Sequence, residues 1–263
     1  MKRVAIVGAA GRMGQVMAEG LAREGDVAVR ALVDIAEPAR SQDAVVATSL
    51  TSLDPSSIDA VVDFSTPDGV VASAAWCAAN RVGLVVGTTG LSDAQRELVA
   101  QAARSTRVVM AANFAIGAVL AERFAVLAAP YFERAEVIEL HHDAKVDAPS
   151  GTSLSTARAL AAARRAAGRI DLPEPTQRES VEGSRGANVE GVRVHAVRLP
   201  GLVAHEEILF GGPGEGLTIR HDSFDRRSFV QGVALALRKM GDEPGLSVGV
   251  GEFLTSPTGN FEL

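Results

Sequence analysis

The fold of this chain is decided by the stretch Val4-Ala5-Ile6-Val7-Gly8-Ala9-Ala10-Gly11-Arg12-Met13-Gly14. Its apolar half predicts a buried strand, and its glycines follow at a spacing that is a variant of the dinucleotide fingerprint GxGxxG. Glycine is needed in such a turn because a Cβ would block the tight bend, keep the backbone away from a pyrophosphate, or hold the next helix off the sheet. The helix that begins here directs N–H donors and partial positive charge at the same point.

The turn therefore predicts a dinucleotide site, and an ordinary glycine-rich turn between strand and helix is the alternative. Asp34 lies at the end of the second predicted strand, about 20 positions after Gly14, where a carboxylate can accept hydrogen bonds from ribose hydroxyl groups. A strand-ending acid without a ligand is the alternative for Asp34. The residues expected here to bind the cofactor are Gly8, Gly11, Arg12, Met13, Gly14 and Asp34.

The carboxylate of Asp34 favours NADH, because it repels the 2′-phosphate of NADPH. Arg12 is the nearest basic residue able to meet that phosphate. We therefore expect NADH, NADPH or both as cofactor, with NADH at least as good a donor.

Short β-branched runs alternate with Ala-rich helical periodicity over residues 1–112. This alternation predicts a parallel sheet covered by helices, because parallel neighbours need helical crossovers. The expected strands are Val4 to Val7, Val27 to Val33, Ala60 to Phe64, Gly83 to Val86 and Val108 to Met110. The expected helices are Met13 to Arg23, Val70 to Ala79 and Asp93 to Arg104.

Three further turns follow the later strands of this region. A doubly wound sheet binds its ligand at the carboxyl ends of the strands, so these turns are expected to line the cofactor. Their Ser and Thr residues are also favoured helix N-caps, and both roles can hold together. The residues singled out are Phe64, Gly87, Thr88, Thr89, Ala112, Asn113 and Phe114.

The pattern changes at about Phe114, which predicts a second domain of α+β class. Residues Gly168 to Gly186 are rich in Pro, Glu, Arg and Gly without a period, which indicates an exposed loop. The expected helices run from Phe114 to about Leu127, from about Thr152 to Ala167 and from Arg227 to Met240. The expected strands are Glu136 to His141, Val189 to Leu199, Leu202 to Phe210 and Leu217 to His221, with an antiparallel sheet formed by the last three.

Composition excludes several classes of protein. The 263 residues suffice for one large domain or two modest ones, and 47% hydrophobic with 22% charged residues is a globular balance. The formal net charge of -6 argues against a nucleic-acid binder, because phosphate neutralisation needs a basic excess. The most apolar region, Val108 to Pro130, is interrupted by Asn113 and Glu122-Arg123, so no membrane helix is expected.

The single cysteine, Cys77, cannot form an intramolecular disulfide and lies in an Ala-rich helical stretch, where a small buried thiol is expected. The chain runs from Met1 straight into a strand, without an apolar core of the signal-peptide type. Both features lead us to expect a cytoplasmic protein.

The densest polar stretch is Glu139 to Thr152, with the sequence E-L-H-H-D-A-K-V-D-A-P-S-G-T. Its last residues, Ser150-Gly151-Thr152, begin a helix, so hydroxyl and N–H groups converge in a cradle for a carboxylate or phosphate. Plain N-capping by Ser150 is the alternative. Two histidines and Lys145 in the same loop add proton-transfer groups, which predicts a site for an acidic small molecule. No further Cys or His has a matching short spacing, so no metal is expected.

The sequence resembles the family of 4-hydroxy-tetrahydrodipicolinate reductases, also called dihydrodipicolinate reductases. The stretches that carry the resemblance are Gly8 to Gly14, Gly87 to Gly90, Ala111 to Gly117, Glu139 to Thr152 and Arg198 to Glu206. They span nearly the whole chain. One departure is Ile35 after Asp34, where some relatives place a basic residue, and this argues against strong use of NADPH.

The resemblance implies a Rossmann-type domain at 1–112, completed by 222–263, and a substrate-binding and tetramerisation domain at 113–221. It implies loss of water from 4-hydroxy-2,3,4,5-tetrahydrodipicolinate and its reduction to tetrahydrodipicolinate, in the diaminopimelate route to lysine, by a homotetramer joined through the substrate-domain sheets. It implies that His141 is the catalytic acid/base and Lys145 the second proton donor. The residues implied to hold substrate carboxylates are His142, Ser150, Gly151 and Thr152.

Two other functions fit the same residues. One is a different two-domain NAD(P)-dependent reductase of a small acid, and the other is a non-catalytic nucleotide sensor on the same scaffold, since a fold alone does not give a function.

Overall fold

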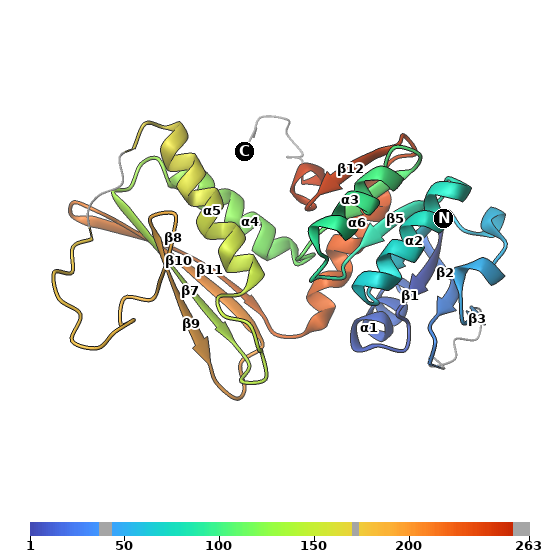
Figure 1. Ribbon diagram of the computed structural model, residues 1–263, viewed down its shortest axis with the longest axis horizontal. Helices are drawn as coiled ribbons and strands as arrows, with labels where there is room; N and C mark the ends of the chain where they lie inside the picture. The colour runs from blue at the N-terminus through green and yellow to red at the C-terminus, as the bar shows by residue number, and fades with distance from the viewer. Residues whose placement is uncertain (37–43, 170–173, 255–263) are drawn as a thin grey trace. The chain divides into compact units, whose positions relative to one another are not determined.

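The computed structural model describes residues 1–36, 44–169 and 174–254, and they form two compact units (Figure 1). The first unit runs from Met1 to Ile116 and is completed by the stretch that begins at Arg226. The second runs from Gly117 to Asp225. Among the helices of these described ranges, none is both long and apolar enough to span a membrane.

The first unit is built on a seven-stranded sheet with the strand order β12-β6-β5-β4-β1-β2-β3, and every neighbouring pair in it is parallel. This order confirms the predicted Rossmann-type fold. The strands are β1 (Lys2–Val7), β2 (Val27–Val33), β3 (Val45–Ala47), β4 (Ala60–Asp63), β5 (Gly83–Val86), β6 (Arg107–Met110) and β12 (Gly245–Val248). The helices are α1 (Arg12–Leu21), α2 (Pro67–Asn80), α3 (Asp93–Ala102) and α6 (Val230–Lys239).

Successive strands of this sheet lie to one side of β1 up to β3 and then to the other side from β4 onward. Ligands of open parallel sheets bind at such a switch point. The central strands are apolar and fully buried because helices cover a parallel sheet on both faces; Ile6, Val62 and Val85 have no exposed surface. The carboxyl ends of β1 and β4 are therefore held rigidly side by side.

The second unit has a five-stranded sheet with the order β11-β10-β7-β9-β8. Alternate residues of β7 are buried, because one face of the sheet packs on helices; Val137 meets Leu160 and Ile208 in the core. The strands are β7 (Arg134–His141), β8 (Ala187–Val189), β9 (Val192–Arg198), β10 (Ala204–Gly212) and β11 (Glu215–Ser223). The helices are α4 (Ile116–Ala128) and α5 (Gly151–Ala166).

Two predictions for this sheet are wrong. The run from Val189 to Leu199 is not one strand, because Glu190 and Gly191 both have positive φ (51° and 92°) and turn β8 back on β9 as a hairpin. The sheet is mixed rather than antiparallel, because β7 and β9 are parallel neighbours joined through α5. The sequence analysis also missed β3 and β12, the short outermost strands of the first sheet.

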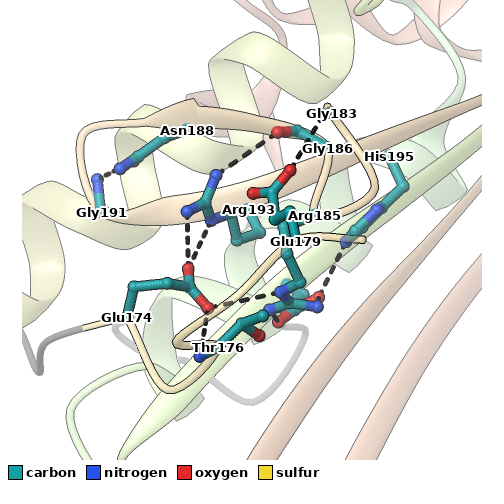
Figure 2. Close-up of polar contacts among 11 residues, drawn as sticks. Glu174, Thr176, Glu179, Gly183, Arg185, Gly186, Asn188, Gly191, Arg193 and His195 are labelled. Atoms are coloured by element: carbon teal, nitrogen blue, oxygen red, sulfur yellow. Dashed lines mark hydrogen bonds and ion pairs between the residues drawn. The ribbon is translucent and has the colours of Figure 1, made fainter. Parts of the chain in front are cut away.

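The expected exposed loop before β8 is described from Glu174 onward, and ion pairs anchor it to the sheet (Figure 2). Glu174 accepts hydrogen bonds from Arg193 at 2.6 and 2.8 Å. Arg185 pairs with Glu136, which also accepts from His195 at 2.8 Å. The Arg193 guanidinium is the main cause that lowers the pKa of Glu174 to about 2. This segment is largely exposed and yet tied to β7 and β9.

Candidate active site

The glycine turn of the first unit permits close backbone contacts that no other residue would allow. Gly8 has a φ of +79°, and a Cβ on it would lie 2.6 Å from the carbonyl oxygen of Phe64. A Cβ on Gly14 would lie 2.0 Å from the carbonyl oxygen of Gly8. These contacts bring the ends of β1 and β4 and the start of α1 together, as the fingerprint requires.

The N-terminus of α1 is open to an anion. Its N-cap, Gly11, makes no side-chain cap, and the first turn holds no acidic residue. No carboxylate in the first turn therefore neutralises the partial positive charge at the start of the helix. Arg12 is exposed and Met13 is partly buried at this end of the helix. The arrangement fits a pyrophosphate.

A cavity of about 480 Å³ lies against this turn. Asp34 borders it, with Oδ2 accepting a hydrogen bond from the N–H of Ala10 at 2.9 Å and Oδ1 accepting one from Ala36 at 3.1 Å. Each carboxylate oxygen keeps a second lone pair, so Asp34 can hold the turn and also accept from a ribose hydroxyl. The lining residues that sequence reasoning did not single out include Thr48, Ser49, Thr51, Ser73 and Trp76.

The remaining expected cofactor residues have different surroundings. Phe64 lines the cavity, and a Cβ on Gly87 would lie 2.0 Å from its ring. The Thr88 hydroxyl is 3.2 Å from the carboxylate of Asp63. Thr89 and Ala112 are exposed. These residues lie near the switch point but outside the lining of the cavity, apart from Phe64.

The turn after β6 is partly buried in the core. Phe114 is fully buried, with its ring centroid 6.1 Å from that of Phe64, so its ring packs in the core of the unit. Asn113 accepts a hydrogen bond from the N–H of Ala115 at 2.8 Å through Oδ1. Its side chain thus orders the entry to α4.

In the second unit, a buried ion pair lies at the end of β7. Glu139 has no exposed surface, and both of its carboxylate oxygens accept hydrogen bonds from the guanidinium of Arg198, at 2.7 and 2.8 Å. Glu139 also binds Nδ1 of His141. A carboxylate is an acceptor, so Nδ1 carries the proton and the lone pair of the neutral ring lies on Nε2.

The charges of this cluster shift its pKa values. Burial by itself would raise the pKa of Glu139, but the hydrogen bonds from Arg198 and His141 outweigh it and hold that pKa below its usual range. Burial lowers the pKa of His141, and this outweighs the opposite effect of Glu139, while the ammonium of Lys145 lowers it further. A neutral imidazole beside an ionised carboxylate is the result at neutral pH, which suits proton transfer.

The loop after β7 holds Lys145 close to this pair. Its ammonium is 2.7 Å from Oδ1 of Asp147, and its side chain is 21% exposed. Its N–H donates to the carbonyl of His142 at 3.1 Å, and Arg198 donates to the carbonyl of Asp147 at 2.7 Å. The guanidinium that neutralises Glu139 thus also ties down the lysine loop. His142 begins the same loop and is partly buried.

Helix α5 begins beside the same carboxylate. Ser150 is its N-cap: the Ser150 hydroxyl accepts from the N–H of Ser153 at 3.2 Å, and the Ser150 N–H donates to Glu139 at 3.2 Å. The side chain of Ser150 is therefore committed to the cap. Gly151 is exposed and Thr152 is partly exposed in the first turn. The structure brings His141, Lys145 and the start of α5 together around Glu139.

Sequence reasoning missed the roles of Glu139 and Arg198. The available signal was a glutamate at a core-facing position of a strand, since a buried carboxylate needs a partner. Nothing local pointed to Arg198, which is distant in the sequence and becomes a neighbour only through the parallel pairing of β7 with β9. In the described part of the chain, no group of three or more His, Cys, Asp and Glu residues is arranged to hold a metal ion.

Two protein-family models match this chain. Residues 2–114 match a family model described as dihydrodipicolinate reductase, N-terminus. Residues 114–254 match one described as dihydrodipicolinate reductase, C-terminus. The two matches together take in both compact units.

Similar proteins include two 4-hydroxy-tetrahydrodipicolinate reductases. The one from Bifidobacterium animalis subsp. lactis is 50% identical over 264 residues, with 97% of this chain and 99% of the relative covered. The one from Corynebacterium urealyticum is 44% identical over 257 residues, with the same coverage. A solved structure, a dipicolinate-bound dihydrodipicolinate reductase from Paenisporosarcina sp. TG-14, has a TM-score of 0.86 and 38% identity, covering 97% of this chain and 100% of its own.

The ion pair at Glu139 predicts a specific pH dependence of stability. The folded-state pKa of Glu139 is below the ordinary value, so its stabilising contribution is full above about pH 4.5 and is lost as the pH falls through the folded-state pKa. Replacing Glu139 with Gln leaves Arg198 unpaired, and we expect it to lower the free energy of unfolding at pH 7 by about 3 kcal/mol. Urea unfolding between about pH 3.5 and pH 8 measures both effects.

The difference between the wild-type protein and Glu139→Gln should be constant above about pH 5 and should shrink below about pH 4.5. Glu97→Gln, on the exposed face of α3, is the control and should change little. Stability curves of the wild-type protein and Glu139→Gln that stay parallel down to the lowest pH would contradict the assignment.

Proposed function

This chain belongs to the dihydrodipicolinate reductase family, and from that membership we propose the roles of its residues in catalysis. The protein is an NAD(P)H-dependent 4-hydroxy-tetrahydrodipicolinate reductase of the diaminopimelate route to lysine. It removes the 4-hydroxyl group of its substrate as water and adds one hydride and one proton. The observation that carries the proposal is the group formed by Glu139, His141 and Lys145 at the start of α5.

The residues at the switch point of the first unit fit a dinucleotide. The bound coenzyme supplies the hydride. We assign the pyrophosphate to the N–H groups at the uncapped start of α1, and the ribose hydroxyls to Asp34. The cofactor residues proposed are Gly8, Gly11, Arg12, Met13, Gly14, Asp34, Phe64, Gly87, Thr88, Thr89, Ala112, Asn113 and Phe114.

We assign the stabilisation of negative charge to Lys145 and proton transfer to His141. Hydride addition to an electron-poor ring creates negative charge, which the ammonium of Lys145 stabilises and can neutralise by donating a proton. His141 is neutral at pH 7, so its Nε2 can take a proton and return it. The Glu139 carboxylate keeps Nδ1 protonated and stabilises the imidazolium while it exists.

The substrate carries two carboxylates that need cationic or N–H partners. We assign them to His142 and to the start of α5 at Ser150, Gly151 and Thr152, where the first turn holds no acidic residue. Because the Ser150 hydroxyl already caps the helix, its part is to shape the turn, and direct contact falls to its neighbours. The Paenisporosarcina relative is described as bound to dipicolinate, a planar dianion, which supports a dicarboxylate site.

The second unit also supports an assembly. The sheet face that does not pack on the helix-side core carries Ile138, Leu140 and Leu209, which remain partly exposed. Apolar surface of this kind favours association, and we propose that four chains join through this face as a homotetramer. We also propose a cytoplasmic location, supported by the free thiol of Cys77, whose pKa burial raises.

Leu209→Glu tests this interface. A charge on the joined face should dissociate the tetramer into smaller species, and sedimentation equilibrium measures the mass. Leu127→Glu in α4, at a residue already 52% exposed, is the matched control and should remain tetrameric. A monomeric wild-type protein, or a tetramer that survives Leu209→Glu unchanged, would show that this face is not the interface.

The catalytic roles predict large losses of rate. His141→Ala and Lys145→Ala should each lower kcat by about 100-fold or more, the usual scale for positioned acid–base groups. The substrate is formed in situ from pyruvate and aspartate semialdehyde, and oxidation of NADH and NADPH is followed separately. NADH binding, measured by fluorescence, should persist in both variants because the dinucleotide residues belong to the other unit.

Lys239→Ala, an exposed lysine of α6, is the control for loss of a positive charge and should keep normal kcat. A folded His141→Ala or Lys145→Ala protein with near-normal kcat would remove that residue from the mechanism. Loss of NADH binding in both variants would mean that the loop supports the cofactor site instead.

Asp34 predicts the coenzyme preference. Its carboxylate repels a 2′-phosphate, so kcat/KM for NADH should equal or exceed that for NADPH. Asp34→Asn keeps an acceptor for the glycine turn but removes the charge, and it should shift the ratio of kcat/KM values toward NADPH. Asp93→Asn, at an exposed residue of α3, should leave the ratio unchanged. A wild-type preference for NADPH above about tenfold, or 1.4 kcal/mol, is the result that would refute this role.

A further inference from the structure

A second buried glutamate lies beside α5, with no cation paired to it among the described residues. Glu206 in β10 is 6% exposed and is the register partner of Glu139 in β7. Its Oε2 accepts a hydrogen bond from the hydroxyl of Thr156 at 3.1 Å, and the hydroxyl of Ser153 lies near enough to the carboxyl to lower its pKa. Its Oε1 is buried without a hydrogen-bond partner in the described structure. Such a group is costly and calls for an explanation.

From Ser153, beside Glu206, a set of hydrogen bonds leads to the histidine. The Ser153 hydroxyl is 2.8 Å from the Ser150 hydroxyl, and the Ser150 N–H donates to Glu139 at 3.2 Å. Glu139 in turn holds Nδ1 of His141. If the Ser153 hydroxyl donates to Glu206, the Ser150 hydroxyl donates to Ser153, and every hydroxyl proton in the set has an acceptor.

The groups that face Glu206 disfavour its ionised form. Carboxyl groups approach it from α4 and β7, at Glu122 and Glu139, and His221 of β11 is its register partner on the other side. Burial is the main cause that raises the pKa of Glu206, the hydroxyl groups of Ser153 and Thr156 oppose it, and the two neighbouring carboxylates add to the rise. The one guanidinium of the cluster, Arg198, is bound to Glu139 on both oxygens.

We propose that Glu206 is a positioning residue for His141: its buried carboxyl orders Ser153 and Ser150 at the start of α5, and through Glu139 it fixes the orientation of the imidazole. The proposal rests on the proposed function, in which His141 transfers protons.

Two substitutions separate positioning from charge. Glu206→Gln keeps the size of the side chain and a carbonyl oxygen that accepts from the hydroxyl groups, and kcat should stay within about threefold of the wild-type value. Glu206→Leu removes the acceptor for Ser153, and kcat should fall about tenfold or more while KM for NADH changes little. In Glu206→Leu the hydrogen bond between Glu139 and His141 should weaken. Because that carboxylate raises the pKa of His141, the pKa should then fall further.

The pH profile of kcat and NMR titration of the His141 ring both measure that shift. Ser155→Ala is the control, because this hydroxyl of α5 contacts Glu122 at 3.2 Å and lies off the path to His141. It should leave kcat and the titration unchanged. Ser153→Ala removes the hydroxyl contact with Ser150, so it should lower kcat and shift the His141 titration as Glu206→Leu does. The double variant should lose no more kcat than either single variant.

Two results would overturn the proposal: a folded Glu206→Leu with wild-type kcat and His141 titration, or a Glu206→Gln as damaging as Glu206→Leu, which would mean that the charge is needed. If Glu206→Leu does not fold, Ser153→Ala gives the same decision through its effect on the His141 titration. The titration does not depend on turnover. Absence of reductase activity in the wild-type protein would therefore refute the proposed function without deciding the coupling of Glu206 to His141.

Discussion

The second unit depends on one interaction, the ion pair of Glu139 with Arg198. A carboxylate with no exposed surface is stable in a strand only if a cation and hydrogen-bond donors replace the water it has lost. The two oxygens of Glu139 receive donors from the end of β9, from His141 and from the start of α5. The same guanidinium reaches the carbonyl of Asp147. The end of a strand, the lysine loop and a helix start are thus ordered around a single charge.

Local patterns in the sequence were sufficient for most helices and strands, and for the glycine turn, because these depend on periodicity and on residues close in the chain. These patterns did not predict features that depend on contacts between residues distant in the sequence. Nothing near β7 shows that β9 lies parallel to it, and Glu190 takes a positive φ that is uncommon for a residue with a Cβ, so the hairpin was missed. The short edge strand β3 lacked a periodic signal, and the cavity residues that follow it were missed with it.

The candidate site shows the same division. A single polar loop carries His141, Lys145 and the α5 start, so a motif could identify them. Arg198 and Glu206 lie on other strands, and only the pairing of those strands with β7 places them beside the site. Their side chains do not meet the substrate in the proposed mechanism. They decide how the residues of the loop are held, which is a property of the fold and not of the motif.

Glu139 and Glu206 are register partners on one face of the sheet and both are buried, yet the pKa of Glu139 is lowered and that of Glu206 is raised. Two neighbouring carboxylates in a dry environment cannot both ionise at low cost, and a single guanidinium can neutralise only one of them. Arg198 is the last residue of β9, on the far side of β7 from β10, so it reaches Glu139. The order of three strands therefore decides which glutamate pairs with the guanidinium and holds His141, and which one remains beside α5 with a hydroxyl group as its partner.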